Sequence, residues 1–306
     1  MKIVLLDALT LGDSDLSMLN ILGEFSAYPV TENEQRLVHI ADNEVIITNK
    51  VIIDKATIDA NPQLKLICIA ATGTNNVDLI AAEKAGVVVK NVSGYSTESV
   101  AQSTFSMLLQ LIHQSRYYDH YTQSKAWCDS PTFTHIEKPF FEIKGKRWGI
   151  IGMGAIGQRV AEIAQVFGCE LCYYSTSGKN TEQAIRQVDL HTLLSSCDII
   201  SIHAPLNGQT ENLIDEKALT LVKKGAVILN LGRGGIIDEL AMAKALDHSE
   251  LYHGTDVLAI EPMQQDHPYF SVQAQSRLLI TPHIAWASAQ ARATLMNEIV
   301  KNIESL

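Results

Sequence analysis

Three side chains in the second half of the sequence are of the types that transfer protons and bind anions. Arg233, Glu261 and His283 each follow a short apolar segment typical of a β-strand; these segments are Val227–Asn230, Gly254–Val257 and Leu278–Thr281. An imidazole exchanges protons near neutral pH, a carboxylate favours its charged form, and a guanidinium binds carboxylates. Each residue alone also fits a structural role. Together they favour one catalytic site, because ligands of open α/β sheets bind beyond the carboxyl ends of the strands.

A glycine-rich turn, Gly152-Met-Gly-Ala-Ile-Gly157, lies between a short apolar run and a segment whose apolar residues have helical spacing. Strand, glycine turn and helix in this order are the context that a dinucleotide-binding loop requires. Glycines permit the tight turn and the approach of the backbone to a pyrophosphate, and the helix N-terminus offers N–H groups to the phosphates. We therefore predict a cofactor-binding turn rather than a purely structural one, formed by Gly152, Gly154, Ala155, Ile156 and Gly157.

The elements that must position these residues alternate between strands and helices along the chain. In the first hundred residues we expect four strands, separated by polar or helical stretches: Ile3–Leu6, Val45–Thr48, Leu66–Ala71 and Val87–Lys90. A second series consists of Trp148–Ile151, Leu171–Tyr174, Ile199–His203 and the three segments named above. The alternation predicts parallel α/β sheets, and the second series has the strand number of a doubly wound dinucleotide fold.

Two longer helices and a polar link are expected around these series. Residues Glu98–Ile112 are apolar around most of the helical circumference, which predicts burial between domains or against another subunit. A polar link runs from Lys125 to Lys146, and Ser288–Leu306 form one more amphipathic helix.

The composition limits the classes of function. The chain has 306 residues, which suits two domains, and 46% of them are hydrophobic. A net charge of −10 without a basic run argues against nucleic acid and anionic membranes as partners. We expect a cytoplasmic protein, because no apolar run approaches the ~20 residues of a membrane span and no signal peptide is evident. Five cysteines form no disulfide framework; Cys169 and Cys172 are expected to be structural thiols, and no metal site is expected.

These motifs resemble those of the D-isomer-specific 2-hydroxyacid dehydrogenase family. The resemblance extends from Ala71-Thr-Gly-Thr-Asn-Asn-Val-Asp78 to Thr281-Pro-His283 and includes the glycine turn and Cys197-Asp-Ile-Ile-Ser-Ile-His-Ala-Pro-Leu206. It implies an α/β protein of two doubly wound parallel-sheet domains. A Rossmann dinucleotide-binding domain, residues 99–283, would be inserted into a flavodoxin-like substrate domain, residues 1–98 and 284–306. It also implies a homodimer, which the apolar helix from Glu98 would fit.

The resemblance also assigns roles to individual residues. We expect His283 to be the general acid and base, Glu261 its partner, and Arg233 the residue that binds the substrate and polarises its carbonyl. Residues expected to bind the substrate are Asn49, Lys50, Thr72, Gly73, Thr74 and Trp286. Beyond the glycine turn, residues expected to bind NAD or NADP are Thr104, Ser175, Lys179, His203, Ala204, Pro205, Thr210, Leu231, Gly232, Arg233, Asp256 and His283. In the family the Asp256 position also tunes the environment of the histidine.

The residues after His283 bear on the substrate. His283-Ile-Ala-Trp-Ala-Ser is similar to the hydroxypyruvate reductases, also called glycerate dehydrogenases. Trp286 either walls a pocket for a small hydroxymethyl group or packs in the core. Lactate, 2-ketoisocaproate and similar acids stay open as substrates. Two further alternatives are a nicotinamide-sensing regulator like the corepressors related to this family, and a formate dehydrogenase.

The choice between NAD and NADP depends on the end of the second strand in the dinucleotide domain. NAD-specific members have an Asp there that hydrogen-bonds the adenosine ribose, whereas this chain has Ser175, followed by Thr-Ser-Gly-Lys179. Hydroxyls and Lys179 are able to bind a 2′-phosphate, although the turn has no arginine to clamp it. Both cofactors remain open, and we expect dual use.

Overall fold

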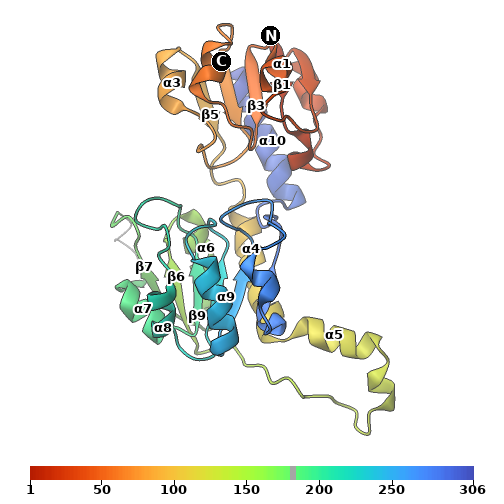
Figure 1. The fold of residues 1–306 in the computed structure, drawn as a ribbon, viewed down its shortest axis with the longest axis vertical. Helices are drawn as coiled ribbons and strands as arrows, with labels where there is room; N and C mark the ends of the chain where they lie inside the picture. The colour runs from red at the N-terminus through yellow and green to blue at the C-terminus, as the bar shows by residue number, and fades with distance from the viewer. Residues whose placement is uncertain (180–183) are drawn as a thin grey trace. The chain divides into compact units, whose positions relative to one another are not determined.

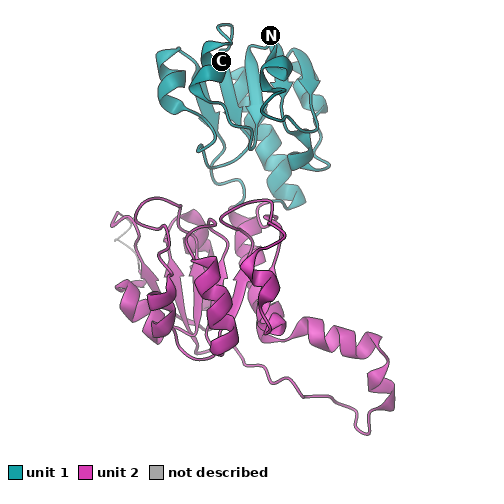
Figure 2. Cartoon of the chain, in the orientation of Figure 1, with its two compact units in different colours: residues 1–96, 287–306 teal, residues 97–286 magenta. Residues whose placement is uncertain are grey.

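The computed structural model describes residues 1–179 and 184–306. It divides into two compact units (Figure 2): unit 1 contains Met1–Ser96 and Ala287–Leu306, and unit 2 contains Thr97–Trp286. Both ends of the chain belong to unit 1, so unit 2 is an insertion within unit 1.

Unit 1 is built on a five-stranded parallel sheet with the order β2-β1-β3-β4-β5 (Figure 1). Its strands are β1 (Lys2–Leu5), β2 (Glu24–Ala27), β3 (Val45–Thr48), β4 (Leu66–Ile69) and β5 (Val88–Asn91). Its helices are α1 (Arg36–Ile40), α2 (Lys55–Asp59), α3 (Leu79–Lys84) and α10 (Ala289–Glu304), with the 3₁₀ turns η1 (Ala8–Leu11) and η2 (Ser17–Ile21). Strands β3 and β4 are buried at every residue, which is typical of parallel strands covered on both faces. This strand order is the flavodoxin-like one.

Unit 2 is built on a seven-stranded parallel sheet with the order β12-β11-β10-β9-β6-β7-β8. Its strands are β6 (Arg147–Ile151), β7 (Glu170–Tyr174), β8 (Arg186–Gln187), β9 (Ile199–Ile202), β10 (Val227–Asn230), β11 (Tyr252–Thr255) and β12 (Leu278–Ile280). Counted from β6, the order is 3-2-1-4-5-6-7, which contains the Rossmann order and reverses between β6 and β9. The predicted fold class, a Rossmann domain inserted into a flavodoxin-like domain, is confirmed.

The helices of unit 2 are α4 (Thr97–Ile112), α5 (Ser115–Gln123), α6 (Ala155–Val166), α7 (Leu190–Ser196), α8 (Glu216–Leu221) and α9 (Glu239–His248), with the 3₁₀ turns η3 (Ala126–Asp129), η4 (Pro268–Ser271) and η5 (Gln275–Arg277). The apolar residues of α4 are buried against the core of unit 2, which also contains Trp148 and Val160. The exposed face of α4 is polar, with Gln102, Ser106 and Gln110. The apolar circumference of this helix is therefore accounted for within its own unit.

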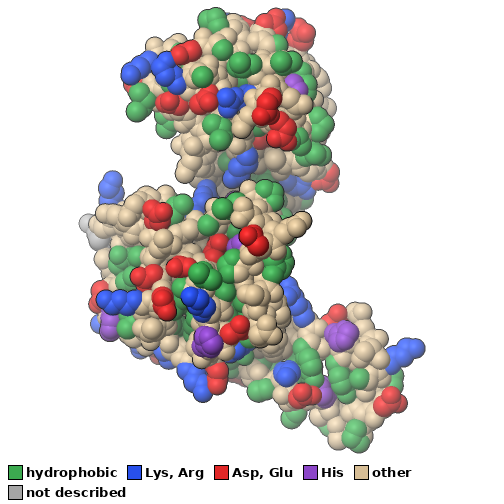
Figure 3. Space-filling view, viewed as in Figure 1, with side chains coloured by type: hydrophobic (Ala, Val, Ile, Leu, Met, Phe, Trp, Pro, Cys, Tyr) green, Lys and Arg blue, Asp and Glu red, His purple; other side chains and the backbone are tan. Residues whose placement is uncertain are grey.

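Residues 115–142 form an arm that leaves the body of unit 2, with α5 projecting away from the sheet (Figure 1). The sequence predicted a polar link over Lys125–Lys146 and did not predict α5. The arm also exposes the large apolar side chains of Trp127, Phe133, Ile136 and Phe140. Hydrophobic side chains, drawn in green, appear on the arm at the lower right of Figure 3. The link over Lys125–Lys146 therefore includes exposed apolar side chains, and the arm carries apolar surface that its own unit does not cover.

Two strands were not predicted, and one was predicted out of position. Strands β2 and β8 lie at sheet edges and have mostly exposed residues, so neither has the continuous apolar run of a central strand. Strand β11 (Tyr252–Thr255) begins and ends two residues earlier than the predicted segment, Gly254–Val257. The residues that follow it, up to Glu261, consequently form a longer loop than expected.

The core of unit 2 contains two polar details. The buried indole of Trp148 donates from Nε1 to Ser201 Oγ at 2.9 Å. Cys172 and Cys197 are buried free thiols whose Sγ atoms lie 3.4 Å apart, and burial raises the pKa of Cys169 to about 11. These thiols are packed as structural residues. In the described residues, no helix combines the length and the apolar character that crossing a membrane would require.

Candidate active site

The carboxyl ends of three neighbouring strands carry the three candidate catalytic residues. Asn230 at the end of β10 pairs with Thr255 of β11, and Thr255 pairs with Ile280 of β12. Arg233 and His283 each follow their strand by three residues, whereas Glu261 lies on the longer loop after β11. Parallel pairing in this register brings the three loops to one edge of the sheet, as the sequence predicted.

His283 and Glu261 form a hydrogen-bonded pair. His283 Nδ1 lies 2.7 Å from Glu261 Oε2, with 24% and 33% of the two side chains exposed, so the pair is partly shielded from solvent. The other carboxylate oxygen, Oε1, accepts the Leu258 N–H at 3.0 Å. His283 has a backbone φ of 54°, which costs a non-glycine residue about 1–3 kcal/mol and is often found at active sites. This arrangement leaves Nε2 of the ring as the atom that faces away from the carboxylate.

Asp256 holds the turn that carries His283. Its carboxylate is buried and accepts hydrogen bonds from Thr281 Oγ1 at 2.5 Å, Ile284 N at 2.9 Å and Ala285 N at 2.8 Å. Its backbone carbonyl accepts the His283 N–H at 2.8 Å. Burial raises the pKa of Asp256, whereas these hydrogen bonds act in the opposite direction. Asp256 therefore fixes the unusual backbone of His283 from two sides.

Arg233 is a half-buried cation. Its Nη1 donates to the carbonyl of Gly232 at 2.8 Å, and no ion pair joins it to a carboxylate within residues 1–179 and 184–306. Asn230 shapes the loop by donating to the Arg233 carbonyl at 2.9 Å and accepting the Gly232 N–H at 3.1 Å. A guanidinium held in this way is suited to binding a carboxylate from a ligand.

The glycine turn at the end of β6 has the geometry of a phosphate-binding loop. Gly152 has φ +93°, and a Cβ there would lie 2.8 Å from Ala204 N; a Cβ on Gly157 would lie 2.2 Å from Gly152 O. A Cβ on Gly154, in contrast, would meet nothing within 4 Å. Gly154 caps helix α6 without a side-chain hydrogen bond. The first turn of α6 therefore faces open space at the point where the strand order reverses, where dinucleotides bind.

The loop after β9 packs against this turn and presents a half-buried histidine, His203. Both ring nitrogens of His203 are buried and have no hydrogen-bond partner in the described part of the chain, and burial lowers its pKa to about 3. A buried polar group without a partner is unusual, and a bound ligand would supply one. A Cβ on Gly232 would lie 2.9 Å from Ala204 O, so Leu231 and Gly232 adjoin the same loop. The residues present therefore fit a bound dinucleotide.

Two threonines expected to bind the cofactor use their hydroxyl groups within the protein. Thr104 is fully buried in α4 and donates to the Val100 carbonyl at 2.8 Å. Thr210 Oγ1 donates to the Pro205 carbonyl at 2.7 Å and accepts the Asn207 N–H at 2.8 Å. Thr210 thus shapes the loop that follows His203.

The end of β7 carries Ser175, which is half-buried, and the exposed Lys179, whose N–H donates to Ser177 Oγ at 3.3 Å. An arginine does lie at this edge, although not in the turn. Arg186 of β8 pairs in register with Cys172, and it lines an open pocket together with Tyr174, Asp189 and Thr192. The sequence did not indicate that Arg186 lies beside this strand.

The remaining candidate residues lie on loops of unit 1, with one exception. Asp7 accepts the N–H groups of Asn49 at 3.0 Å and Lys50 at 2.7 Å, so its buried carboxylate holds that loop after β3. Thr72, which precedes Gly73 and Thr74 after β4, donates to the Val92 carbonyl at 3.1 Å. The exception is Trp286 in unit 2, which is partly buried and packs against the core cluster containing Trp148.

Sequence reasoning missed residues that act through others. Asp7 lies just beyond β1, and its position after a strand was a signal that it belongs to a loop edge. Glu239 and His267 form a hydrogen-bonded pair at 2.9 Å behind the Glu261 loop, but they are too far apart in sequence for any spacing to link them. The described residues contain no group of His, Cys, Asp and Glu side chains that could hold a metal ion.

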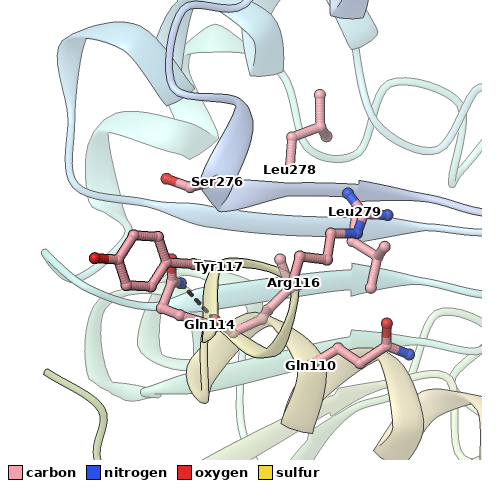
Figure 4. A pocket seen from close by; sticks show the side chains of 8 residues that line it. Gln110, Gln114, Arg116, Tyr117, Ser276, Leu278 and Leu279 are labelled. Carbon is pink, nitrogen blue, oxygen red and sulfur yellow. Dashed lines mark hydrogen bonds between the residues drawn. The ribbon is translucent and has the colours of Figure 1, made fainter. Parts of the chain in front are cut away.

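A small pocket lies at the opposite end of β12 from His283 (Figure 4). It is lined by residues at the junction of α4 and α5 and at the start of β12, including Gln110, Gln114, Tyr117, Ser276 and Leu278. Gln114 points its amide to the Leu111 carbonyl at 2.7 Å. The pocket belongs to the root of the arm and takes no part in the site.

Comparisons with known proteins agree with this geometry. Residues 105–285, more than half of the chain, match the model of the D-isomer specific 2-hydroxyacid dehydrogenase, NAD binding domain. The chain is 34% identical over 313 residues to a hydroxypyruvate reductase of Blautia hydrogenotrophica, with 99% of this chain and 96% of that protein covered. It is 32% identical over 306 residues to a glycerate dehydrogenase of Methylorubrum extorquens, with 99% and 95% covered.

A solved structure extends the comparison. The acyclic imino acid reductase in complex with NADPH and D-Arg superposes with a TM-score of 0.83 at 30% identity, covering 100% of this chain and 96% of that one. The chain therefore belongs to the D-isomer-specific 2-hydroxyacid dehydrogenases, oxidoreductases that use NAD or NADP and act on a CH–OH group.

Proposed function

We propose that this protein interconverts a small 2-oxo acid and its D-2-hydroxy acid, with His283 as the general acid and base. The observation that carries the proposal is the 2.7 Å pair between His283 Nδ1 and Glu261 on a loop edge that also carries the cation Arg233. Reduction of a 2-oxo acid requires a proton donor and a cation for the carboxylate, and this edge of the sheet supplies both.

Each side chain has a defined task in the reaction. The glycine turn and the loop after β9 would hold a nicotinamide cofactor, which would supply or accept the hydride. His283 gives the carbonyl oxygen a proton from Nε2. Its Nδ1–H stays hydrogen-bonded to Glu261, whose negative charge stabilises the imidazolium. Arg233 binds the substrate carboxylate and polarises the carbonyl. In the oxidation direction His283 Nε2 removes the hydroxyl proton.

We propose hydroxypyruvate and D-glycerate as the substrate pair. The sequence around Trp286 is similar to hydroxypyruvate reductases, and the reductase of Blautia hydrogenotrophica aligns over 99% of this chain. In unit 1 we assign binding of the carboxylate to the amides of Thr72, Gly73 and Thr74, with support from Asn49 and Lys50. The buried Asp7 fixes the second of these loops through two N–H groups.

We also propose a homodimer. Helix α4 does not support the dimer, because its apolar residues are covered within unit 2. The arm of residues 115–142 does support it, because its apolar side chains are exposed. Exposed apolar surface of this kind marks an interaction site.

The test is a spectrophotometric screen of 2-oxo acids with NADH and with NADPH. We expect the highest kcat/KM with hydroxypyruvate and lower values with glyoxylate and pyruvate. The His283→Ala variant, assayed in parallel, controls for contaminating reductases. If no 2-oxo acid oxidises either nucleotide above the His283→Ala background, the proposal is wrong.

A further inference from the structure

Two carboxylate–imidazole pairs hold consecutive amides of one loop in unit 2. Glu261 accepts the Leu258 N–H at 3.0 Å and lies 2.7 Å from His283 Nδ1. Glu239 accepts the Ala259 N–H at 2.7 Å and lies 2.9 Å from His267 Nε2. Each glutamate thus uses one oxygen for the loop backbone and the other for an imidazole. The second pair is not part of the catalytic set, but it binds the N–H of Ala259, which is next to Leu258, the residue that Glu261 binds.

The second pair is the more deeply buried of the two and has a fixed protonation pattern. The exposed fractions of the His267 and Glu239 side chains are 7% and 15%. His267 Nδ1 accepts the Tyr269 N–H at 3.2 Å, so in the neutral ring the proton lies on Nε2 and is donated to Glu239. Tyr269 is itself buried, and its hydroxyl lies 3.2 Å from His253 Nε2. The pair is therefore anchored to the core.

The loop that carries Glu261 needs such an anchor. Residues 259–262 are exposed, so side-chain packing does not fix them. The loop passes so close to Gly234 that a Cβ there would lie 1.9 Å from the Leu258 carbonyl carbon. At Leu258 the loop thus packs against the Arg233 loop. At Ala259, the next residue, the hydrogen bond to Glu239 holds the loop.

We propose that Glu239, oriented by His267, is a positioning residue that holds Glu261 in register with His283. The inference rests on the proposed roles of Glu261 and His283. Without the acceptor for the Ala259 N–H, the exposed loop relaxes and the carboxylate of Glu261 leaves the imidazole. Asp256, which holds the turn that carries His283, belongs to a separate hydrogen-bond network with Thr281, Ile284 and Ala285. Misplacement of a catalytic group by about 1 Å costs up to ~100-fold in rate.

The experiment compares pH profiles of kcat/KM for 2-oxo acid reduction. In Glu239→Ala we expect kcat/KM to fall about 10- to 100-fold and its alkaline limb to move to lower pH, with the KM for the cofactor unchanged. Glu239→Gln keeps an acceptor oxygen for Ala259 and should show a smaller shift of the same sign. Glu216→Ala is the matched control, because Glu216 also opens a helix after a capping aspartate but has an exposed side chain.

The double variant Glu239→Ala/Glu261→Gln separates positioning from bulk stability. If Glu239 acts through Glu261, the limb of the double variant coincides with that of Glu261→Gln alone. A Glu239→Ala enzyme with a lower Tm but a wild-type limb, or additive limb shifts in the double variant, would overturn the inference. If Glu261→Gln itself leaves the limb unmoved, the proposed role of Glu261 fails first, and the positioning role falls with it.

Discussion

The imidazole of His283 and the carboxylate of Glu261 come from adjacent loops of one sheet, and their atoms Nδ1 and Oε2 lie 2.7 Å apart. The pair depends on a histidine with positive φ, which the buried Asp256 holds through the amides of Ile284 and Ala285. The orientation of the ring is therefore set by the backbone on one side and by Glu261 on the other. Nε2 remains for proton exchange with a substrate.

Replacing His283 by alanine should remove most turnover and leave cofactor affinity nearly intact. General acid–base catalysis contributes roughly 100- to 10,000-fold in rate, so kcat should fall by about that factor. Arg233→Ala should raise KM for the 2-oxo acid and lower kcat together, because the guanidinium acts in binding and in polarisation. Steady-state kinetics and cofactor titration by fluorescence measure these effects; wild-type turnover in His283→Ala would refute the assignment.

The pH dependence of kcat/KM should reflect the interaction between His283 and Glu261. Reduction consumes a proton from His283, so kcat/KM for reduction should fall as pH rises and the imidazolium loses its proton, and oxidation should weaken as pH falls. Glu261→Gln removes the charge that stabilises the imidazolium, so the alkaline limb of reduction should move to lower pH. Profiles for both directions check this, and coincident limbs in wild type and variant would exclude Glu261 from the role.

Local patterns were sufficient to predict parallel α/β sheets and a dinucleotide fold, because central parallel strands and the glycine turn are continuous in sequence, whereas the insertion of one domain into the other was predicted from the resemblance to the family. Edge strands β2 and β8 lack the apolar run of central strands and could not be predicted in this way. The same limit applies to the site. Arg233, Glu261 and His283 each follow a strand, but the contact of Glu239 with Ala259 and His267 depends on how the loop after β11 folds back.

Stability should fall in mild acid because of His253. Burial lowers the pKa of this residue to about 4, while its ring bonds the Ile228 carbonyl and Tyr269. The unfolded chain, with a histidine pKa of about 6.5, therefore binds more protons than the folded chain between these values. The free energy of unfolding should drop by up to about 3 kcal/mol from this residue as pH falls through that window.

Chemical denaturation of wild type and His253→Asn at a series of pH values measures the effect. The asparagine keeps a donor for the Ile228 carbonyl and does not titrate. We expect the variant to be less stable near neutral pH but to lose less stability on acidification. Parallel curves for the two proteins would contradict this account.

The arm should mediate self-association. Phe133 is 90% exposed and Ile136 is 78% exposed, so Phe133→Asp/Ile136→Asp should convert a dimer into a monomer without unfolding it. Ile21 in unit 1, with 85% exposure, provides a control, since Ile21→Asp should leave the dimer intact. Light scattering at micromolar concentration measures the oligomeric state of each variant. A monomeric wild-type protein would argue against the proposal.

Cofactor choice should depend on Ser175. A carboxylate at the end of the second strand accepts hydrogen bonds from the ribose hydroxyls and repels a 2′-phosphate, and Ser175 does neither strongly. The hydroxyls that follow it, with Lys179 as a point charge, provide groups for a phosphate. We therefore expect measurable activity with NADPH as well as NADH, and Ser175→Asp should shift the ratio of kcat/KM values towards NADH by at least about tenfold, or ~1.4 kcal/mol.

The neighbouring Ser177 gives the control for that substitution. Ser177 is exposed and two residues further along the turn, beyond the strand end, so Ser177→Asp adds the same charge without the ribose acceptor. If position 175 selects the cofactor, Ser175→Asp should raise kcat/KM with NADH and lower it with NADPH, whereas Ser177→Asp should only lower the NADPH value. Equal shifts in both variants would show that general charge, and not the ribose contact, governs the choice. Undetectable NADPH turnover in the wild type would mean that the turn passively faces a ribose and that the glycine loop alone holds NAD.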